Sequence, residues 1–328
     1  MTLRACRVYE KDKGVDARMV EMAVDDLTSG EVVIRAEWSG INFKDALAVT
    51  GRGRIFKRLP LNAGIDVAGC VESSSDGRFA PGDEVLVNGM GLGETQDGGF
   101  AERVRVPADW VVPMPAGLDT RHAMILGTAG FTAALALHRM ETNGQSPDKG
   151  PIVVTGATGG VGSAAVSMLA RRGYRVIAVS GRSEHHAYLR ELGASEVTTA
   201  DGLGLGSKSL ESARFGGAID NVGGQLLQKL IPHVALWGNV AAIGNAGGAA
   251  FDATVFPFIL RGVSLLGASS ANCPMTLRTE IWHMLGDDVQ PGRLERIVGG
   301  VVPLAEVIPA CSTLMNRTAR GRVLVDCR

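Results

Sequence analysis

The sequence predicts an α/β protein in which a doubly wound parallel sheet is joined to a second, β-rich domain. The first observation is a short β-branched run, followed by glycines at 156, 159 and 162 and then by small and apolar residues at helical spacing. Second, strand and helix patterns alternate from residue 150 onward, as in βαβ units. Third, the chain before about Pro115 carries short alternating runs between dense turns.

Length and charge restrict the classes of protein to which this chain can belong. Its 328 residues suit two domains better than a single core. With 33 basic and 34 acidic residues the net charge is −1, which predicts neither a nucleic acid nor an anionic membrane as partner and favours a small molecule. The five cysteines never form a C-x-x-C pair, and we find neither a signal peptide nor an apolar window of membrane-spanning length. We therefore expect a cytoplasmic protein.

The expected elements follow the chain in order. In the β-rich part we expect strands at residues 31–38, 64–72, 84–87 and 101–106, and then an apolar stretch at 123–139 that is too long for a strand and predicts helix. In the alternating part we expect strands at 152–155, 174–180, 218–222, 239–243 and 263–269, with helices at 184–192 and 225–234. A helix at 276–285 and a strand at 322–326 would return to the first domain.

The glycine-rich turn carries the first functional prediction. Its spacing, G-x-x-G-x-x-G between a strand and a helix, allows the backbone to approach a phosphate, at which the helix directs its free N–H groups. The preceding strand and the following amphipathic helix supply the context that this motif requires. We expect a dinucleotide here, the alternative being a tight turn without a ligand. The residues concerned are Gly156, Thr158, Gly159, Gly160, Val161 and Gly162.

The end of the next strand indicates which dinucleotide binds. Enzymes that use NAD place an acid about 20 residues beyond the first glycines to hold the ribose 2′-hydroxyl. This chain has Ser180, Gly181 and Arg182 there instead. A serine hydroxyl and a guanidinium can bind the additional 2′-phosphate of NADP, so we expect NADPH as the cofactor. The alternative is that Arg182 is a solvated residue at the start of the next helix.

Four motifs are distributed along the chain: the Gly82-Asp83-x-Val85 turn, the Gly99-Phe100-Ala101-Glu102 run, residues 127–133 and the glycine-rich turn. Together they resemble the medium-chain dehydrogenase/reductase superfamily, in particular its zinc-free, quinone-reductase-like branch. Zinc-containing members have a cysteine where this chain has Asn42, and Gly-His-Glu where it has Gly64-Ile65-Asp66. We therefore expect no catalytic metal.

Within that superfamily, residues 40–47, 257–263 and 180–182 resemble the acryloyl-CoA reductase group, which reduces acryloyl-CoA to propanoyl-CoA with NADPH. The resemblance implies a groES-like catalytic domain at residues 1–123 and 271–328, a Rossmann domain at 124–270, and a homodimer. It implies cofactor contacts at Thr158 to Val161, Ser180 to Arg182, Ile259, Ser270 and Asn316, and it places Phe43, Thr128 and Asn245 at cofactor positions. This chain departs from the group at Phe43, where a tyrosine is usual, at Ala200, where an arginine is usual nearby, and at Asn245, where an apolar residue is usual.

Three neighbouring residues are candidates for the catalytic step. The amide of Asn42 could donate to a thioester oxygen or to the nicotinamide carboxamide, or the residue could only cap the helical turn that follows. Lys44 and Asp45 belong to that turn and could line a catalytic cleft or form an exposed pair. Because Phe43 lacks a hydroxyl, the proton donor has no assigned residue.

Two further features suggest partners. Arg52, Arg54, Lys57 and Arg58 form a dense basic loop that could dock the phosphates of CoA, or simply be a solvated face. The segment 263–270 could pair at a sheet edge across a two-fold axis in a dimer. Three functions remain open: an NADPH-dependent reductase of a small 2-enoyl-CoA, a quinone or free-enone reductase, and an NADPH-binding or sensing protein of weak activity.

Overall fold

The computed structural model describes residues 1–288, 291–316 and 319–328, which fold into two compact units. Met1–Thr128 and Ser270–Arg328 form unit 1, and Ala129–Ser269 form unit 2. The sequence predicts these divisions after residues 123 and 270. The chain thus leaves unit 1 within the helix α2 (Thr120–Thr142), close to Gly127, whose φ of 49° and ψ of −154° interrupt the helical geometry.

Unit 1 contains two sheets. A three-stranded sheet has the order β2-β1-β4, and a seven-stranded sheet has the order β15-β16-β3-β5-β6-β8, with β7 also pairing with β3. The strands are β1 (Thr2–Lys11), β2 (Gly14–Ala23), β3 (Val32–Ile41), β4 (Leu61–Asn62), β5 (Asp66–Ser74), β6 (Glu84–Asn88), β7 (Arg103–Val106), β8 (Val112–Pro113), β15 (Val298–Pro303) and β16 (Arg322–Asp326). The helices are α1 (Phe43–Val49), α7 (Met275–Asp288), α8 (Pro291–Ile297) and α9 (Val307–Met315).

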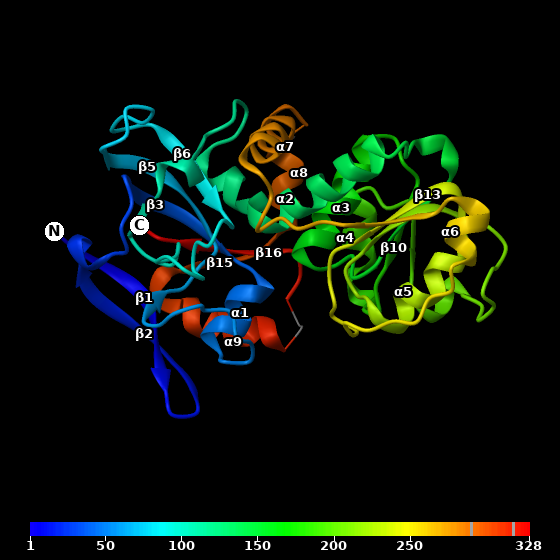
Figure 1. Ribbon diagram of the computed structural model, residues 1–328, viewed down its shortest axis with the longest axis horizontal. Helices are drawn as coiled ribbons and strands as arrows, with labels where there is room; N and C mark the ends of the chain where they lie inside the picture. Colours follow the sequence, from blue (N-terminus) through cyan, green and yellow to red (C-terminus); the bar gives the residue numbers. More distant parts are fainter. Residues whose placement is uncertain (289–290, 317–318) are drawn as a thin grey trace. The chain divides into compact units, whose positions relative to one another are not determined.

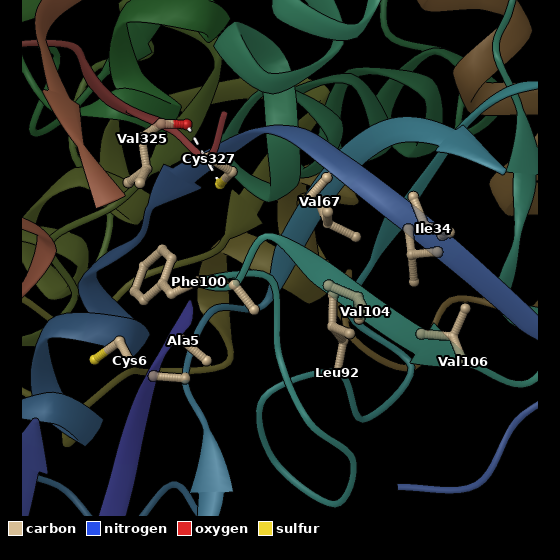
Figure 2. Packing of buried hydrophobic residues seen from close by; sticks show 14 of the residues in the cluster. Ala5, Cys6, Ile34, Val67, Leu92, Phe100, Val104, Val106, Val325 and Cys327 are labelled. Carbon is tan, nitrogen blue, oxygen red and sulfur yellow. Dashed lines mark hydrogen bonds between the residues drawn. The ribbon is translucent and has the colours of Figure 1, made fainter. Parts of the chain in front are cut away.

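The core of unit 1 joins these two sheets. Phe100 is fully buried. As Figure 2 shows, it lies between Ala5 and Cys6 of β1 and the end of β16. Alternate residues of β3, β5 and β7 point into the same core, among them Ile34, Val67 and Val104. This inward and outward alternation agrees with the period-two pattern from which the strands were predicted.

Unit 2 is a six-stranded parallel sheet with the order β11-β10-β9-β12-β13-β14. Its strands are β9 (Ile152–Val154), β10 (Val176–Val179), β11 (Glu196–Thr198), β12 (Phe215–Asp220), β13 (Val234–Ala242) and β14 (Ser264–Gly267). Figure 1 shows its helices around the sheet: α3 (Gly160–Arg171), α4 (His186–Glu191), α5 (Gly224–Leu230) and α6 (Phe256–Arg261). The predicted doubly wound parallel sheet is confirmed, and its direction of winding reverses between β9 and β12.

The helix α2 is long and apolar enough to cross a membrane by length and composition. Its 18-residue apolar window, with a mean hydropathy of 1.2, is 83% buried in the structure. The expectation that no window would approach this length was therefore wrong. The burial of α2 is typical of a core helix.

Candidate functional site

The glycine-rich turn joins β9 to α3, and each of its conspicuous glycines has a distinct role. Gly156 has a φ of +58°, which favours glycine. Gly159 caps α3 and is exposed. Apart from its chain neighbours, the one atom within 4 Å of a Cβ built there would be the main-chain oxygen of Gly156, at 3.5 Å. A Cβ on Gly162 would lie 2.4 Å from that same oxygen, so the helix can pack on the turn only with glycine. The open face of the turn is available to a phosphate, and Gly160 and Val161 begin the helix behind it.

The last residue of β12, Asp220, and the residue after it, Asn221, hold this turn at the point where the sheet reverses. The Thr155 hydroxyl donates to the Asp220 carboxylate over 2.6 Å and accepts the Asn221 main-chain N–H over 2.9 Å. The Asn221 amide donates to the Thr155 carbonyl over 2.8 Å. Asp220 is fully buried, and burial raises the pKa of its carboxyl. This support was not predicted, although an acid within the apolar strand predicted at 218–222 was a signal that could have found it.

The second strand of this unit, β10, ends at Val179 and is followed by Ser180, Gly181 and Arg182. Arg182 donates from Nη2 to the hydroxyl of Thr158 over 2.8 Å, which brings the guanidinium to the glycine-rich turn. The hydroxyl of Ser180, a buried residue, accepts the main-chain N–H of Arg182 over 3.2 Å. The first acid beyond β10 is Glu184, which is exposed on the following turn. This strand end therefore presents a hydroxyl and a cation, which fit a 2′-phosphate.

The remaining predicted cofactor residues lie in both units. In unit 2, Asn245 is exposed in the loop after β13, and Ile259 on α6 is 68% exposed. In unit 1, Phe43 opens α1 and is 44% exposed, while Asn316 caps the end of α9 and is exposed. Ser270 begins the segment that returns to unit 1. Their contacts with a cofactor stay predictions.

A buried polar cluster, consisting of Asn42, Asp45, Asp66, Thr128 and Arg322, lies in unit 1. The Asp66 carboxylate accepts the main-chain N–H of Thr128 over 2.9 Å and its hydroxyl over 2.6 Å. It also accepts the Asn42 amide over 2.8 Å and Arg322 Nη2 over 3.2 Å. The cluster thereby ties the ends of β3, β5 and α1 to β16 and to α2 at the interrupted turn.

Arg322 supplies the positive charge of this buried polar cluster. Its Nη1 donates to the Asn42 side-chain oxygen over 2.8 Å and to the Ile41 carbonyl over 3.2 Å. Its Nε and Nη2 donate to the carbonyls of Ile125 and Met124 over 3.2 and 3.3 Å. These contacts also orient the Asn42 amide, because its oxygen faces a cation while its nitrogen faces carboxylates. The sequence analysis did not single out Arg322.

The three predicted catalytic residues have different surroundings. The Asn42 amide donates to Asp66, to Asp45 over 3.2 Å and to the Gly40 carbonyl, so it would have to leave these acceptors to reach a substrate. Asp45 is fully buried and accepts the Ile65 N–H over 2.9 Å. Lys44 instead forms an ion pair with Glu94 over 2.7 Å. The alternative of an exposed Lys44–Asp45 pair is wrong, because consecutive residues of a helix point in different directions.

The cationic side chains of the loop after α1 are all exposed. Within the described ranges, none of them forms an ion pair. Main-chain bonds hold the loop: Arg52 N–H donates to the Leu47 carbonyl over 3.0 Å, and Lys57 N–H to the Glu94 carbonyl over 2.8 Å. The loop thus presents its charges on an anchored backbone. Its cations are Arg52, Arg54, Lys57 and Arg58.

Comparison with known proteins identifies the family. Residues 28–116 match the alcohol dehydrogenase GroES-like domain, and residues 160–285 match the zinc-binding dehydrogenase domain. The chain is 47% identical to the "Putative quinone oxidoreductase YhfP" of Bacillus subtilis, with 98% of each chain covered. It is 42% identical to the "Acrylyl-CoA reductase AcuI" of Ruegeria pomeroyi, with 97% of this chain and 98% of that one covered. The chain belongs to the medium-chain dehydrogenase/reductase superfamily. It is accordingly an oxidoreductase, as the motifs predicted.

Two crystal structures are similar to this chain over nearly its whole length. The yhdH oxidoreductase of Salmonella enterica, in complex with NADP, has a TM-score of 0.95 at 43% identity and covers 100% of both chains. The yhfP protein of Bacillus subtilis, with NAD bound, has a TM-score of 0.95 at 44% identity and covers 99% of both chains. The predicted combination of groES-like and Rossmann domains is confirmed.

The cluster around Asp66 contains two of the positions at which the resemblance to zinc-containing members predicts a change of residue. Asn42 stands where a cysteine is expected in those members, and Asp66 follows Ile65, which stands where a histidine is expected. Arg322 forms an ion pair with Asp66. Among the residues that the structure describes, no group of three or more His, Cys, Asp or Glu side chains is placed to hold a metal ion.

Proposed function

We propose that this protein reduces the C=C bond of a small 2-enoyl-CoA, acryloyl-CoA to propanoyl-CoA, with NADPH. The observation that carries the proposal is the 42% identity, over nearly the whole chain, to a protein named acrylyl-CoA reductase. The exposed, anchored cations of residues 52–58 support it, because they offer contacts to the phosphates of CoA.

The cofactor is NADPH, as the sequence analysis predicted. A similar structure contains NADP, and the hydroxyl of Ser180 and the guanidinium of Arg182 support the choice, because they are groups that can bind a 2′-phosphate. The open face at Gly159 leaves room for the pyrophosphate. NADPH supplies the hydride when bound, and the residues of unit 2 hold its phosphates.

Replacing Arg182 by alanine should change the choice of cofactor. We expect Arg182→Ala to raise the KM for NADPH by about tenfold to a hundredfold, since a charge-assisted contact to a phosphate is lost, and to leave that for NADH nearly unchanged. Steady-state kinetics with both cofactors measures this. Arg190→Ala, an exposed arginine on α4, is the matched control and should alter neither value. Equal effects of Arg182→Ala on both cofactors would contradict the role.

Enoyl reduction requires that the substrate carbonyl be polarised and that the α-carbon receive a proton. On this proposal Asn42, Lys44 and Asp45 set the geometry of the start of α1, from which Phe43 projects. Because Phe43 has no hydroxyl, the side chain can shape an apolar contact but cannot donate the proton. We therefore propose a bound water as the proton donor.

The basic loop leads to a prediction that separates CoA esters from other substrates. Arg52→Gln/Arg54→Gln should raise the KM for acryloyl-CoA by about tenfold while leaving that for a free enone unchanged, since only the ester carries phosphates. Steady-state kinetics at saturating NADPH measures both. Lys11→Gln/Lys13→Gln removes two exposed cations elsewhere in unit 1 and controls for net charge. An equal rise for both substrates would remove the docking role.

A quinone or free-enone reductase is the second candidate, and the 47% identity to a protein named as a quinone oxidoreductase favours it. NADPH and NADH consumption against acryloyl-CoA, crotonyl-CoA and a benzoquinone decides between the two. A higher kcat/KM for acryloyl-CoA supports the thioester reductase. Preference for the quinone would overturn it, and no turnover of any of the three would favour a protein that only binds or senses NADPH.

We also propose that the protein is a cytoplasmic homodimer formed through unit 2. The strand β14 lies at the edge of the sheet, as the sequence-based prediction for residues 263–270 requires. Exposed apolar residues gather beside it, where α6 packs on β13 and the Trp237 ring lies over Gly262. They are Leu236, Trp237, Val255, Phe256, Ile259, Leu260 and Leu265.

A charge on this apolar face should separate the subunits. Leu260→Glu places a carboxylate on a side chain that is 58% exposed, and we expect sedimentation analysis to change from dimer to monomer. Val301→Glu, at an exposed apolar position on β15 of unit 1, is the control and should leave the dimer intact. A dimer that survives Leu260→Glu would refute this interface.

A further inference from the structure

The segment by which the chain returns to unit 1 is irregular but firmly held. Between β14 and α7 the chain runs through Ser270, Ala271 and Cys273 without a strand or helix. Its main-chain carbonyl groups therefore accept no hydrogen bonds from a helix or a neighbouring strand and need other donors. Ser270, at its beginning, is one of the residues proposed above to contact the cofactor.

Arg278, in the first turn of α7, supplies these donors from a fully buried position. Its Nη2 donates to the carbonyls of Ser270, Ala271 and Cys273 over 2.8, 3.3 and 3.4 Å. Its Nη1 donates to the carbonyl and the side-chain oxygen of Asn88 over 2.6 and 2.9 Å. One guanidinium thus connects the return segment to the end of β6.

The turn after β6 holds the same segment from its other side. Met90 N–H donates to the Ala271 carbonyl over 3.0 Å. Gly89 has a φ of +67°, and a Cβ there would lie 2.9 Å from the Cα of Ala271, so the two backbones are in direct contact. The indole of Trp282 donates to the Asn88 side-chain oxygen over 3.0 Å and fixes its orientation.

The chemistry of this contact requires arginine. Removing a cation from water is costly, and burial therefore lowers the pKa of Arg278. A planar guanidinium can direct its four Nη hydrogens at two separate backbone segments, whereas a lysine ammonium is a single point. Because this buried cation donates to main-chain carbonyls, it fixes the backbone conformation of the return segment.

We infer that Arg278 is a positioning residue for the nicotinamide end of the cofactor, which it orients by fixing the return segment at Ser270. The inference rests on the proposed function, since it assumes that Ser270 meets NADPH at its nicotinamide end. Displacing Ser270 would weaken the hold on the nicotinamide and its alignment for hydride transfer. The 2′-phosphate of the adenosine end is proposed to meet Ser180 and Arg182 instead, so binding of that end would not be affected.

The test compares two ligands and three variants. Arg278→Lys keeps the charge, Arg278→Met keeps the volume, and Ile281→Ala is a matched control, because it opens a cavity at a buried apolar position of the same helix. Binding of NADPH and of 2′,5′-ADP, which lacks the nicotinamide, is measured by titration, together with kcat and the thermal midpoint. We expect both Arg278 variants to raise the Kd for NADPH by about tenfold, the equivalent of about 1.4 kcal/mol, and to lower kcat.

The Kd for 2′,5′-ADP should stay as in the wild type, and Ile281→Ala should lower the thermal midpoint without changing either Kd. The inference is overturned if Arg278→Lys retains wild-type NADPH affinity and kcat, or if Ile281→Ala shifts NADPH affinity as much as the Arg278 variants do. Failure of the proposed function looks different, because the wild-type protein would then prefer a benzoquinone to acryloyl-CoA while the Kd for each of the two ligands still distinguished the Arg278 variants from Ile281→Ala.

Discussion

Arg322→Met is expected to reduce the free energy of unfolding by about 3–5 kcal/mol, because it leaves a buried carboxylate without its cation. Arg322 is 2% exposed and Asp66 is fully buried, so water cannot replace the lost charge. The carbonyls of Ile41, Met124 and Ile125 lose a donor at the same time. Urea denaturation of the purified variant measures this loss.

Two further variants identify its cause. Arg322→Lys keeps the charge but cannot serve both Asn42 and Asp66, so we expect an intermediate loss. Arg103→Met breaks the partly exposed ion pair with Glu72 and should cost no more than about 1 kcal/mol. A loss for Arg322→Met as small as that for Arg103→Met would show that the buried pair is not a major contribution to stability.

Arg322 also shows what the sequence could not predict. Its carboxylate partner Asp66 lies 256 positions away along the chain, and no local pattern connects the two. Asp66 itself was noticed only as a departure from the zinc-ligand motif. The glycine-rich turn, by contrast, was predictable, because the positive φ of Gly156 and the close packing at Gly162 are properties of adjacent residues.

The same distinction explains the errors in elements and side-chain pairs. The bounds of the β1–β2 hairpin were not predicted, because charged residues interrupt its apolar alternation. The hairpin is stabilised by pairing between strands, such as that of Cys6 with Met19, and by packing in the core around Phe100. Lys44 and Asp45 are adjacent in sequence, but the ion pair of Lys44 is with Glu94, 50 positions further on. Side-chain partners follow from tertiary structure, which sequence spacing alone does not contain.

Asp45 should make the stability of the protein decrease as the pH rises towards neutrality. Burial, and then the negative charge of Asp66, raise the pKa of the Asp45 carboxyl from 3.8 to about 7, although hydrogen bonds from Asn42 and Ile65 oppose them. A folded-state pKa above the unfolded one means that the native state binds the proton more tightly. The stabilisation is therefore complete below about pH 4 and is lost as the pH rises through about 7.

Urea denaturation of the wild type and of Asp45→Asn between pH 5 and pH 8 tests this sign. The difference in unfolding free energy between the two should fall with pH, by up to about 1.4 kcal/mol per pH unit, because groups common to both cancel. Asp76→Asn is the control: the contact with Arg78 lowers the pKa of Asp76 to about 2, so its difference from the wild type should not vary in this range. A difference in unfolding free energy between the wild type and Asp45→Asn that stays constant with pH would contradict this prediction. It would mean that Asp45 stays ionised, because the three hydrogen bonds that it accepts favour the charged form more than burial and Asp66 disfavour it.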